Sequence, residues 1–112
     1  MARQSRELRE HERVELACPI KLYDNGGEVL AQSKTLNISD GGALVSLPLD
    51  SLPKIGSKTN ITLSVPRATP TTYMLEDFAC RGEVIRHQPL VESNFAGLAL
   101  RFDEAQELGL VV

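Results

Sequence analysis

Aromatic residues are scarce in this chain. It has no tryptophan, two tyrosines and three phenylalanines among 112 residues. A core must therefore be built from leucine, valine, isoleucine and alanine, and the hydrophobic content of 42% is ordinary for a globular protein. The scarcity also argues against a barrel that binds single-stranded nucleic acid, because such proteins stack bases on aromatic side chains. The length suits one compact domain.

Long hydrophobic runs are also absent. No apolar stretch approaches the ~18 residues that a membrane-spanning helix needs, so we expect no direct membrane insertion. The N-terminal residues are basic, but no apolar segment of a secretory signal follows them, so we expect a cytoplasmic protein. The sequence contains neither an internal repeat nor a low-complexity segment.

Cysteine and histidine are too few and too scattered to suggest a metal site. Cys18 and Cys80 form no Cys-x-x-Cys pair, and neither histidine has ligands at a suitable spacing. Each cysteine falls on the apolar phase of a strand-like segment, which favours a small buried hydrophobic side chain. No Ser/His/Asp or Cys/His arrangement stands out, so we expect neither a resident cofactor nor an enzyme.

Charge is unevenly distributed along the chain. The net charge is −3, yet residues 1–13 contain four arginines against three glutamates, and the rest is acidic. An acidic body is a poor surface for a nucleic-acid polymer, whereas an arginine-bearing arm can hold a small anion. Because residues 1–12 also lack apolar periodicity, we expect a flexible arm over 1–12 and one domain over 13–112.

Alternating polar and apolar residues predict a series of short β-strands after the arm. The alternation begins over residues 13–23, where Pro19 lacks a ladder donor and should place the strand at a sheet edge or in a bulge. The next strand is expected over 28–38, with Leu36 and Ile38 in phase near its end. Further strands are expected over 43–47, 60–65, 74–87 and 95–102.

Glycine marks the turns and bends between these strands. The Asn-Gly-Gly sequence at 25–27 predicts a hairpin, because these residues accept positive φ angles at little cost. Six short antiparallel strands indicate a small all-β barrel or sandwich, and glycines within strands, Gly82 and Gly97, favour the curved strands of a barrel. After the last strand we expect a short C-terminal helical turn over 103–108, with Asp103 as its N-cap.

One arginine in the arm and one directly after it form the first candidate for ligand binding. Arg9 and Arg13 are four residues apart, in the sequence Arg-Glu-His-Glu-Arg. The guanidinium is a planar fork that pairs with phosphate or with guanine O6 and N7, and it stacks on purines. Four-residue spacing keeps both forks within reach of one ligand. Taken alone, the pair also fits a solvated arm with Arg/Glu pairs.

A polar, glycine-bearing turn over 37–43, Asn-Ile-Ser-Asp-Gly-Gly-Ala, forms the second candidate. Asn37 offers a donor and an acceptor, and the hydroxyl of Ser39 can act as either. Gly41 and Gly42 allow backbone conformations closed to other residues and let a ligand approach the chain. The alternative is a β-turn that Asn and Ser side chains merely stabilise. One small anionic nucleotide would satisfy both candidates.

The order and spacing of these motifs resemble the PilZ domain family, which are bacterial receptors for cyclic di-GMP. The family pattern places Arg-x-x-x-Arg before the first strand and Asn-x-Ser-x-x-Gly after the second, as here. Similar fragments occur over 52–56, 82–86 and 97–102, so the resemblance covers nearly the whole chain. It implies a six-stranded antiparallel β-barrel and a role in second-messenger signalling.

The resemblance also implies roles for individual residues. Arg9 and Arg13 would grip guanine edges and phosphates of the dinucleotide. Asn37 and Ser39 would meet the other guanine edge, and Gly42 would keep that approach open. The implied ligand-binding residues are Leu8, Arg9, Arg13, Asn37, Ser39, Gly41 and Gly42.

Two positions depart from the usual family pattern. Asn37 stands where many members have aspartate, so it loses a charge-assisted bond to guanine N–H groups, and we expect a modestly altered affinity. Leu8 stands where many members have a further arginine, which accompanies binding of a stacked ligand pair. Because leucine offers neither a donor nor a charge, we expect one ligand per protein.

The resulting hypothesis is a ligand-gated receptor. Cyclic di-GMP would order the arm onto the barrel and change the surface offered to a protein partner or a fused effector domain. The alternative is a PilZ-like protein-interaction module that binds no nucleotide. Arg86 and Arg101, on late strands, either reach the ligand or remain solvated arginines of the barrel face.

Overall fold

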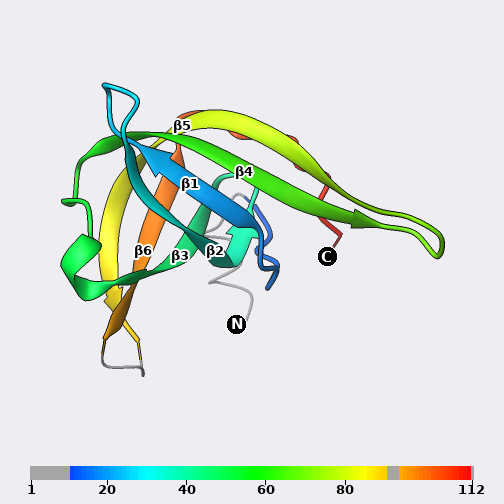
Figure 1. The fold of residues 1–112 in the computed structure, drawn as a ribbon, viewed down its shortest axis with the longest axis horizontal. Coiled ribbons are helices and arrows are strands. Elements are labelled where there is room, and N and C mark those ends of the chain that lie inside the picture. The colour runs from blue at the N-terminus through cyan, green and yellow to red at the C-terminus, as the bar shows by residue number, and fades with distance from the viewer. Residues whose placement is uncertain (1–10, 91–93, 112) are drawn as a thin grey trace, which may run out of the picture.

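Figure 1 shows the computed structural model of the protein, which describes residues 11–90 and 94–111. Within these ranges, six antiparallel strands form a closed barrel, which confirms the all-β, six-stranded antiparallel β-barrel expected from the sequence. No helix in this part of the chain is long and apolar enough to cross a membrane. The elements are β1 (Pro19–Tyr23), β2 (Val29–Ser39), β3 (Gly42–Pro48), the 3-10 helix η1 (Leu49–Ser51), β4 (Lys58–Ala68), β5 (Tyr73–Pro89) and β6 (Phe95–Phe102).

Two strand pairs close the barrel from distant parts of the chain. Around the barrel the strands follow the order β1, β2, β3, β6, β5, β4, and β4 pairs with β1. The β3–β6 pair aligns Gly42 with Arg101 and Pro48 with Phe95. The beginning of β3 and the end of β6 therefore lie side by side, although they are far apart in sequence.

The barrel interior is almost entirely aliphatic, as the composition requires. Cys18 belongs to this core, and Cys80 is half-buried and packs against it, in agreement with their expected role as small hydrophobic side chains. Phe102 is the one aromatic side chain among the core residues of the described chain. The core cluster consists of Cys18, Ile20, Leu22, Ile38, Ala43, Val45, Leu47, Ile61, Leu63, Val65, Val84, Leu98, Leu100, Phe102 and Leu108.

The first strand is shorter than predicted. Residues before Pro19 are extended, but Val14 makes only an isolated bridge to Ile38, and β1 itself begins at Pro19. The prediction that Pro19 marks a sheet edge or a bulge was wrong, because β1 pairs with strands on both sides and its bulge lies between Leu22 and Tyr23. Pro19 is tolerated because it is the first residue of the strand, ahead of the β4 pairing.

A bulge in β2 changes which residues face the core. Thr35 is paired with Val45 and Asn37 with Leu44, so Leu36 is an extra residue without a partner in the ladder. Leu36 is 41% exposed, whereas Ile38 is fully buried, so the predicted common face of these two residues was wrong. The bulge reverses the inward–outward alternation at this point and directs Asn37 away from the core.

The expected C-terminal helical turn does not form. Residues 105–111 have no regular secondary structure, and the Asp103 carboxylate contacts Lys58 Nζ at 2.7 Å instead of capping a helix. The Leu108 side chain is fully buried in the barrel core. The segment therefore follows an irregular path that satisfies tertiary contacts, and these override its weak local tendency to form a helix.

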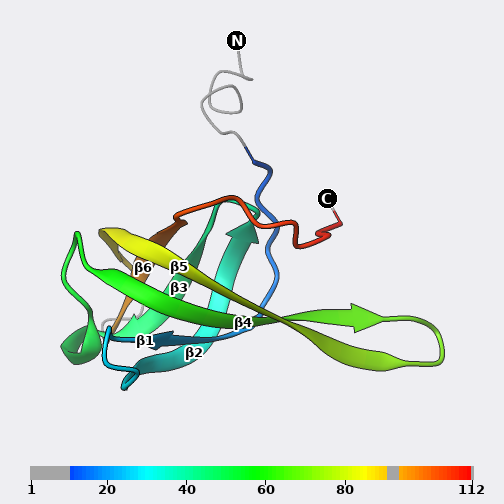
Figure 2. The same cartoon turned by 90° about the horizontal axis from the view of Figure 1, so that it is seen from above.

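Strands β4 and β5 continue beyond the barrel as a two-stranded ribbon, which projects to one side in Figures 1 and 2. β1 pairs with β4 only up to Leu63, and β6 pairs with β5 only from Gly82 onward, so the remaining parts of both strands pair only with each other. Three consecutive apolar residues near the end of this ribbon are exposed. They are Tyr73, Met74 and Leu75.

Candidate functional site

The residues that directly follow the predicted arm run beside the end of β2. Val14 and Ile38 exchange two backbone hydrogen bonds, with N–O distances of 2.8 and 2.9 Å. This bridge places Arg13 next to Asn37, and Arg13 Nη1 donates a hydrogen bond to Asn37 Oδ1 at 3.1 Å. The fold thus brings together one residue from each of the two motifs, which are separated by most of the first hairpin.

Residues 37–42, called the Asn-Ser turn below, connect β2 to β3. The Gly41 N–H donates to Ser39 Oγ at 3.1 Å, and this hydroxyl is 3.4 Å from the Gly42 carbonyl oxygen. Ser39 is only 7% exposed. The serine therefore stabilises the turn, and it also lines the groove described below.

Limited space, and not an unusual backbone conformation, explains both glycines of the Asn-Ser turn. The glycines with positive φ in the described chain are Gly27, Gly56 and Gly109, so the conformational reason expected for Gly41 and Gly42 was wrong. A Cβ on Gly42 would lie 2.2 Å from the carbonyl oxygen of Leu100 on β6, and one on Gly41 would lie 2.6 Å from His11 Cδ2.

A groove of about 780 Å³ opens between the end of the arm, the Asn-Ser turn and strands β5 and β6. Arg13, Ser39, Gly41 and Gly42, four of the residues implied by the family pattern, line it. Its other lining residues are His11, Lys58, Glu83, Ile85, Leu100, Arg101, Phe102, Asp103 and Ala105.

The groove carries charges of both signs, arranged in exposed pairs. Lys58 Nζ lies 2.7 Å from Asp103 Oδ1 and 3.8 Å from Glu83 Oε1, and Arg101 Nη2 lies 3.3 Å from Glu83 Oε1. Side chains of Lys58 and Arg101 are 43% and 65% exposed. Such pairs contribute little to stability, so an anionic ligand can replace the carboxylates as partner of the cations.

A second, smaller hollow of about 310 Å³ lies on the other side of Arg13. Arg13 and Asn37 line it together with Arg86 and Gln88, whose side chains are joined by a hydrogen bond of 3.2 Å. Arg13 therefore borders both hollows, and Arg86 and Arg101 border one each. This placement brings both late arginines to the candidate site, while their role remains a prediction.

Five of the seven implied residues lie close together in the structure. The other two, Leu8 and Arg9, lie outside the described residues. Lys58 and His11, by contrast, line the groove without having been predicted. Only the pairing of β3 with β6 and of β4 with β5 places these strands around the turn, so no local sequence pattern could have identified Lys58.

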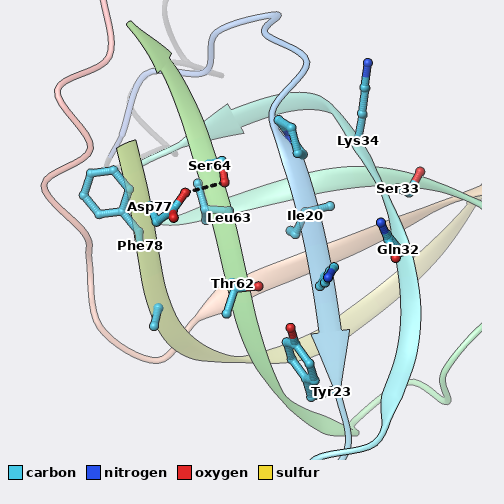
Figure 3. Close-up of a pocket in the computed structure, with 13 residues that line it drawn as sticks. Ile20, Tyr23, Gln32, Ser33, Lys34, Thr62, Leu63, Ser64, Asp77 and Phe78 are labelled. Atoms are coloured by element: carbon cyan, nitrogen blue, oxygen red, sulfur yellow. Dashed lines mark hydrogen bonds between the residues drawn. The ribbon is translucent and has the colours of Figure 1, made fainter. Parts of the chain in front are cut away.

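A hollow somewhat larger than this groove lies elsewhere in the described part of the chain. It has a volume of about 890 Å³ and lies around β1 and its neighbours, with Tyr23, Gln32 and Thr62 among its labelled lining residues in Figure 3. A hydrogen bond of 2.6 Å from Ser64 to Asp77 forms part of one wall. None of the five implied ligand-binding residues that the structure describes lines this hollow. We place the candidate site at Arg13 because the residues of both motifs meet there, although the hollow is smaller.

The cysteines are unsuited to nucleophilic or metal chemistry. Burial, and to a lesser extent the nearby Asp103 carboxylate, raises the pKa of Cys80 to about 11. Burial also raises the pKa of Cys18, although a hydrogen bond with Thr35 and the charge of Arg67 oppose it. In the described ranges no three His, Cys, Asp or Glu side chains are grouped so that they could hold a metal ion.

The sequence profile of the PilZ domain matches residues 7–110. The chain belongs to the PilZ domain family. No protein with curated annotation is similar enough in sequence to count as a relative. The matched range includes the Arg-x-x-x-Arg motif, the Asn-Ser turn and all six strands of this PilZ domain.

Two solved bacterial structures resemble this PilZ domain. MotI/DgrA, the inhibitor of motility from Bacillus subtilis, aligns with a TM-score of 0.71 and 17% identity over 88% of this chain. The PilZ domain of YcgR from Escherichia coli, solved with c-di-GMP, aligns with a TM-score of 0.55 and 14% identity, over 86% of this chain and 78% of that one. This chain spans only 44% of the MotI/DgrA chain. At these identities the two structures show a common fold.

Proposed function

We propose that this PilZ domain is a cytoplasmic receptor for cyclic di-GMP. The observation that carries the proposal is the Arg13–Asn37 hydrogen bond, which joins the two motifs between two hollows. Family membership and the likeness to a PilZ domain solved with c-di-GMP support it. A dinucleotide has two guanine bases and two phosphates, so it can engage both motifs at once.

Arg13 is the central residue of the proposed site. Its guanidinium would exchange the bond to Asn37 Oδ1 for a phosphate or for guanine O6 and N7, and this frees the amide of Asn37 for the other guanine. The exchanged bond is exposed, and it joins a cation to a neutral amide oxygen. In a bond to a phosphate both partners carry a charge, so the bond to the ligand is stronger and favours the exchange.

The remaining cations of the groove would attract the phosphates. Among the described residues, Lys58 and Arg101 form salt bridges with the partly exposed carboxylates of Glu83 and Asp103, and a ligand phosphate could replace these partners. Arg9 would reach the ligand from the arm and hold the arm against the barrel. The ligand-bound domain would then present a different surface to a protein partner or to a fused effector domain.

Calorimetric titration with cyclic di-GMP tests this proposal. Replacing Arg9 or Arg13 with alanine should weaken binding by about thirtyfold, equivalent to about 2 kcal/mol, because each loses charge-assisted bonds. Arg81→Ala is the matched control, because the Arg81 side chain bonds to Asn60 and Asn25 and does not line the groove. The affinity of this variant for cyclic di-GMP should equal that of the wild type. The wild-type stoichiometry should be one ligand per chain. Wild-type affinity in both motif variants would contradict the assignment.

The second candidate is a PilZ-like interaction module that binds no nucleotide. Two observations favour it: Ser39 and Asn37 already have hydrogen-bond partners within the protein, and an apolar triplet is exposed on the β4–β5 ribbon. A wild-type titration without heat change, repeated at a second temperature, would favour this candidate over the receptor.

A further inference from the structure

Asp40 lies in the middle of the Asn-Ser turn but does not line the groove. Its backbone carbonyl accepts a hydrogen bond from the Gln106 N–H at 2.8 Å, and its Oδ1 accepts one from the Leu108 N–H at 3.2 Å. The next carbonyl, that of Gly41, accepts from the Phe102 N–H at 2.9 Å. Three bonds thus connect the turn to the end of β6 and to the chain that follows it.

The chain that follows β6, residues 103–110, is itself firmly held; we call it the C-terminal segment. The side chain of Leu108 is fully buried in the core. Arg67 on β4 donates from Nη1 to the Gly109 carbonyl at 3.0 Å and from Nη2 to the Leu108 carbonyl, and its Nε contacts Glu76 at 3.0 Å. The segment therefore connects the Asn-Ser turn to the outer part of the β4–β5 ribbon, where Arg67 is paired with Met74.

Gly109 lets the C-terminal segment approach Arg67 closely. Its φ is +68°, and a Cβ at this position would lie 3.3 Å from Arg67 Nη2. The contact therefore depends on two features: the left-handed backbone conformation of Gly109 and the three protein partners of the Arg67 guanidinium. A segment held at both of its ends can transmit a displacement of one end to the other.

We propose that Asp40 is a positioning residue for the nucleotide site and that the C-terminal segment is energetically coupled to that site. This inference rests on the proposed receptor function. Ser39 and Gly41 line the groove and flank Asp40 in the chain, so any movement of Asp40 displaces both. By linkage, a ligand that favours one geometry of the turn also favours the bonds from Asp40 to the C-terminal segment.

Three variants test the positioning role by titration with cyclic di-GMP. Asp40→Ala removes the Oδ1 acceptor and should raise the dissociation constant about five- to tenfold. Asp40→Asn keeps an acceptor oxygen and should bind within about twofold of the wild type. Asp50→Ala, an equal change of charge on the exposed helix η1, should leave the affinity unchanged. Equal affinity of Asp40→Ala and wild type would overturn the positioning role.

Residue-resolved amide hydrogen exchange tests the coupling. Saturating cyclic di-GMP should slow exchange of the Gln106 and Leu108 amides, which lie outside the groove, by about fivefold or more. Unchanged rates at both amides would overturn the coupling. In the ligand-free protein, Asp40→Ala should accelerate exchange of the Gly41 amide, whose acceptor is Ser39 Oγ and not Asp40.

The ligand-free measurement separates this inference from the proposed function. If the wild type does not bind cyclic di-GMP, the receptor function fails. Faster exchange of the Gly41 amide in ligand-free Asp40→Ala would still show that Asp40 stabilises the turn. Unchanged exchange of this amide would overturn that role of Asp40. If Asp40→Ala fails to fold, Arg67→Ala takes its place, because it releases the other end of the segment without touching the groove. Arg67→Ala should also weaken ligand binding, and wild-type affinity would overturn the coupling.

Discussion

Two glycine pairs close hairpins at opposite ends of β2, and they do so for different physical reasons. In the β1–β2 turn, Gly27 has a φ of +87°, and a Cβ there would meet nothing within 4 Å. In the Asn-Ser turn, neither glycine has a positive φ, but added Cβ atoms would collide with His11 and with Leu100. In the first pair Gly27 serves the conformation of the chain, whereas both glycines of the second pair serve close packing around the candidate site.

The comparison shows that similar sequences can encode different requirements. Both turns have an asparagine or aspartate followed by two glycines, so residue propensities predict the same kind of turn at both places. The β1–β2 turn is closed locally, by bonds to Asp24 from the Gly26 and Gly27 amides. The Asn-Ser turn is instead surrounded by β6, the arm and the C-terminal segment. Substitutions with alanine should therefore have graded and distinguishable effects on stability.

Gly42→Ala should have the largest effect. The new methyl would lie 2.2 Å from a backbone oxygen of β6, which cannot rotate away, so the β3–β6 pair must separate. We expect a loss of about 3 kcal/mol or more in the free energy of unfolding, measured by urea denaturation. Gly26→Ala is the control, because its Cβ would meet Asp24 Oδ1 at an ordinary 3.4 Å and should cost little. Equal stability of the two variants would refute the packing argument.

Gly27→Ala should have an intermediate effect. The space is open, so the cost is only that of placing an L-residue in the left-handed region, roughly 1–2 kcal/mol. The same urea denaturation measures it. Gly27→Asn should recover part of the loss, because asparagine tolerates this conformation better than alanine. A loss as large as that of Gly42→Ala would mean that the hairpin is packed more tightly than its open surroundings indicate.

Gly41→Ala should have the smallest effect on stability, below about 1 kcal/mol, because the atom it meets is the movable end of the His11 side chain. The double variant with His11→Ala should remove even this loss. Non-additivity in a double-mutant cycle of unfolding free energies would measure the contact. Additive losses would show that Gly41 is required for a reason other than its contact with His11.

Much of the fold could be predicted from the sequence, because alternation is a local signal. All six strands were placed correctly to within a few residues, except that β1 begins later than expected. The errors at Pro19, Leu36 and the C-terminal segment share one cause. Each depends on a pairing or a contact with a distant strand, which no local pattern of hydrophobicity records.

The candidate site divides in the same way. Arg13 and Asn37 could be selected by residue type and spacing, and the structure brings them within hydrogen-bond distance. Lys58 and Asp40 could not, since the first reaches the groove through strand pairing and the second acts on the C-terminal segment. The roles of Leu8 and Arg9 remain predictions, to be tested by titration.

The sequence by itself determined the class of fold, the number of strands and the pair of motifs, because side-chain alternation and the chemistry of arginine, asparagine and serine are properties of neighbouring residues. Only the tertiary structure decided what the glycines are for, which charges surround Arg13, and where the C-terminal segment is anchored. Those features arise from the closure of the barrel, in which β3 meets β6 and β4 meets β1, and closure brings together residues that share no local signal.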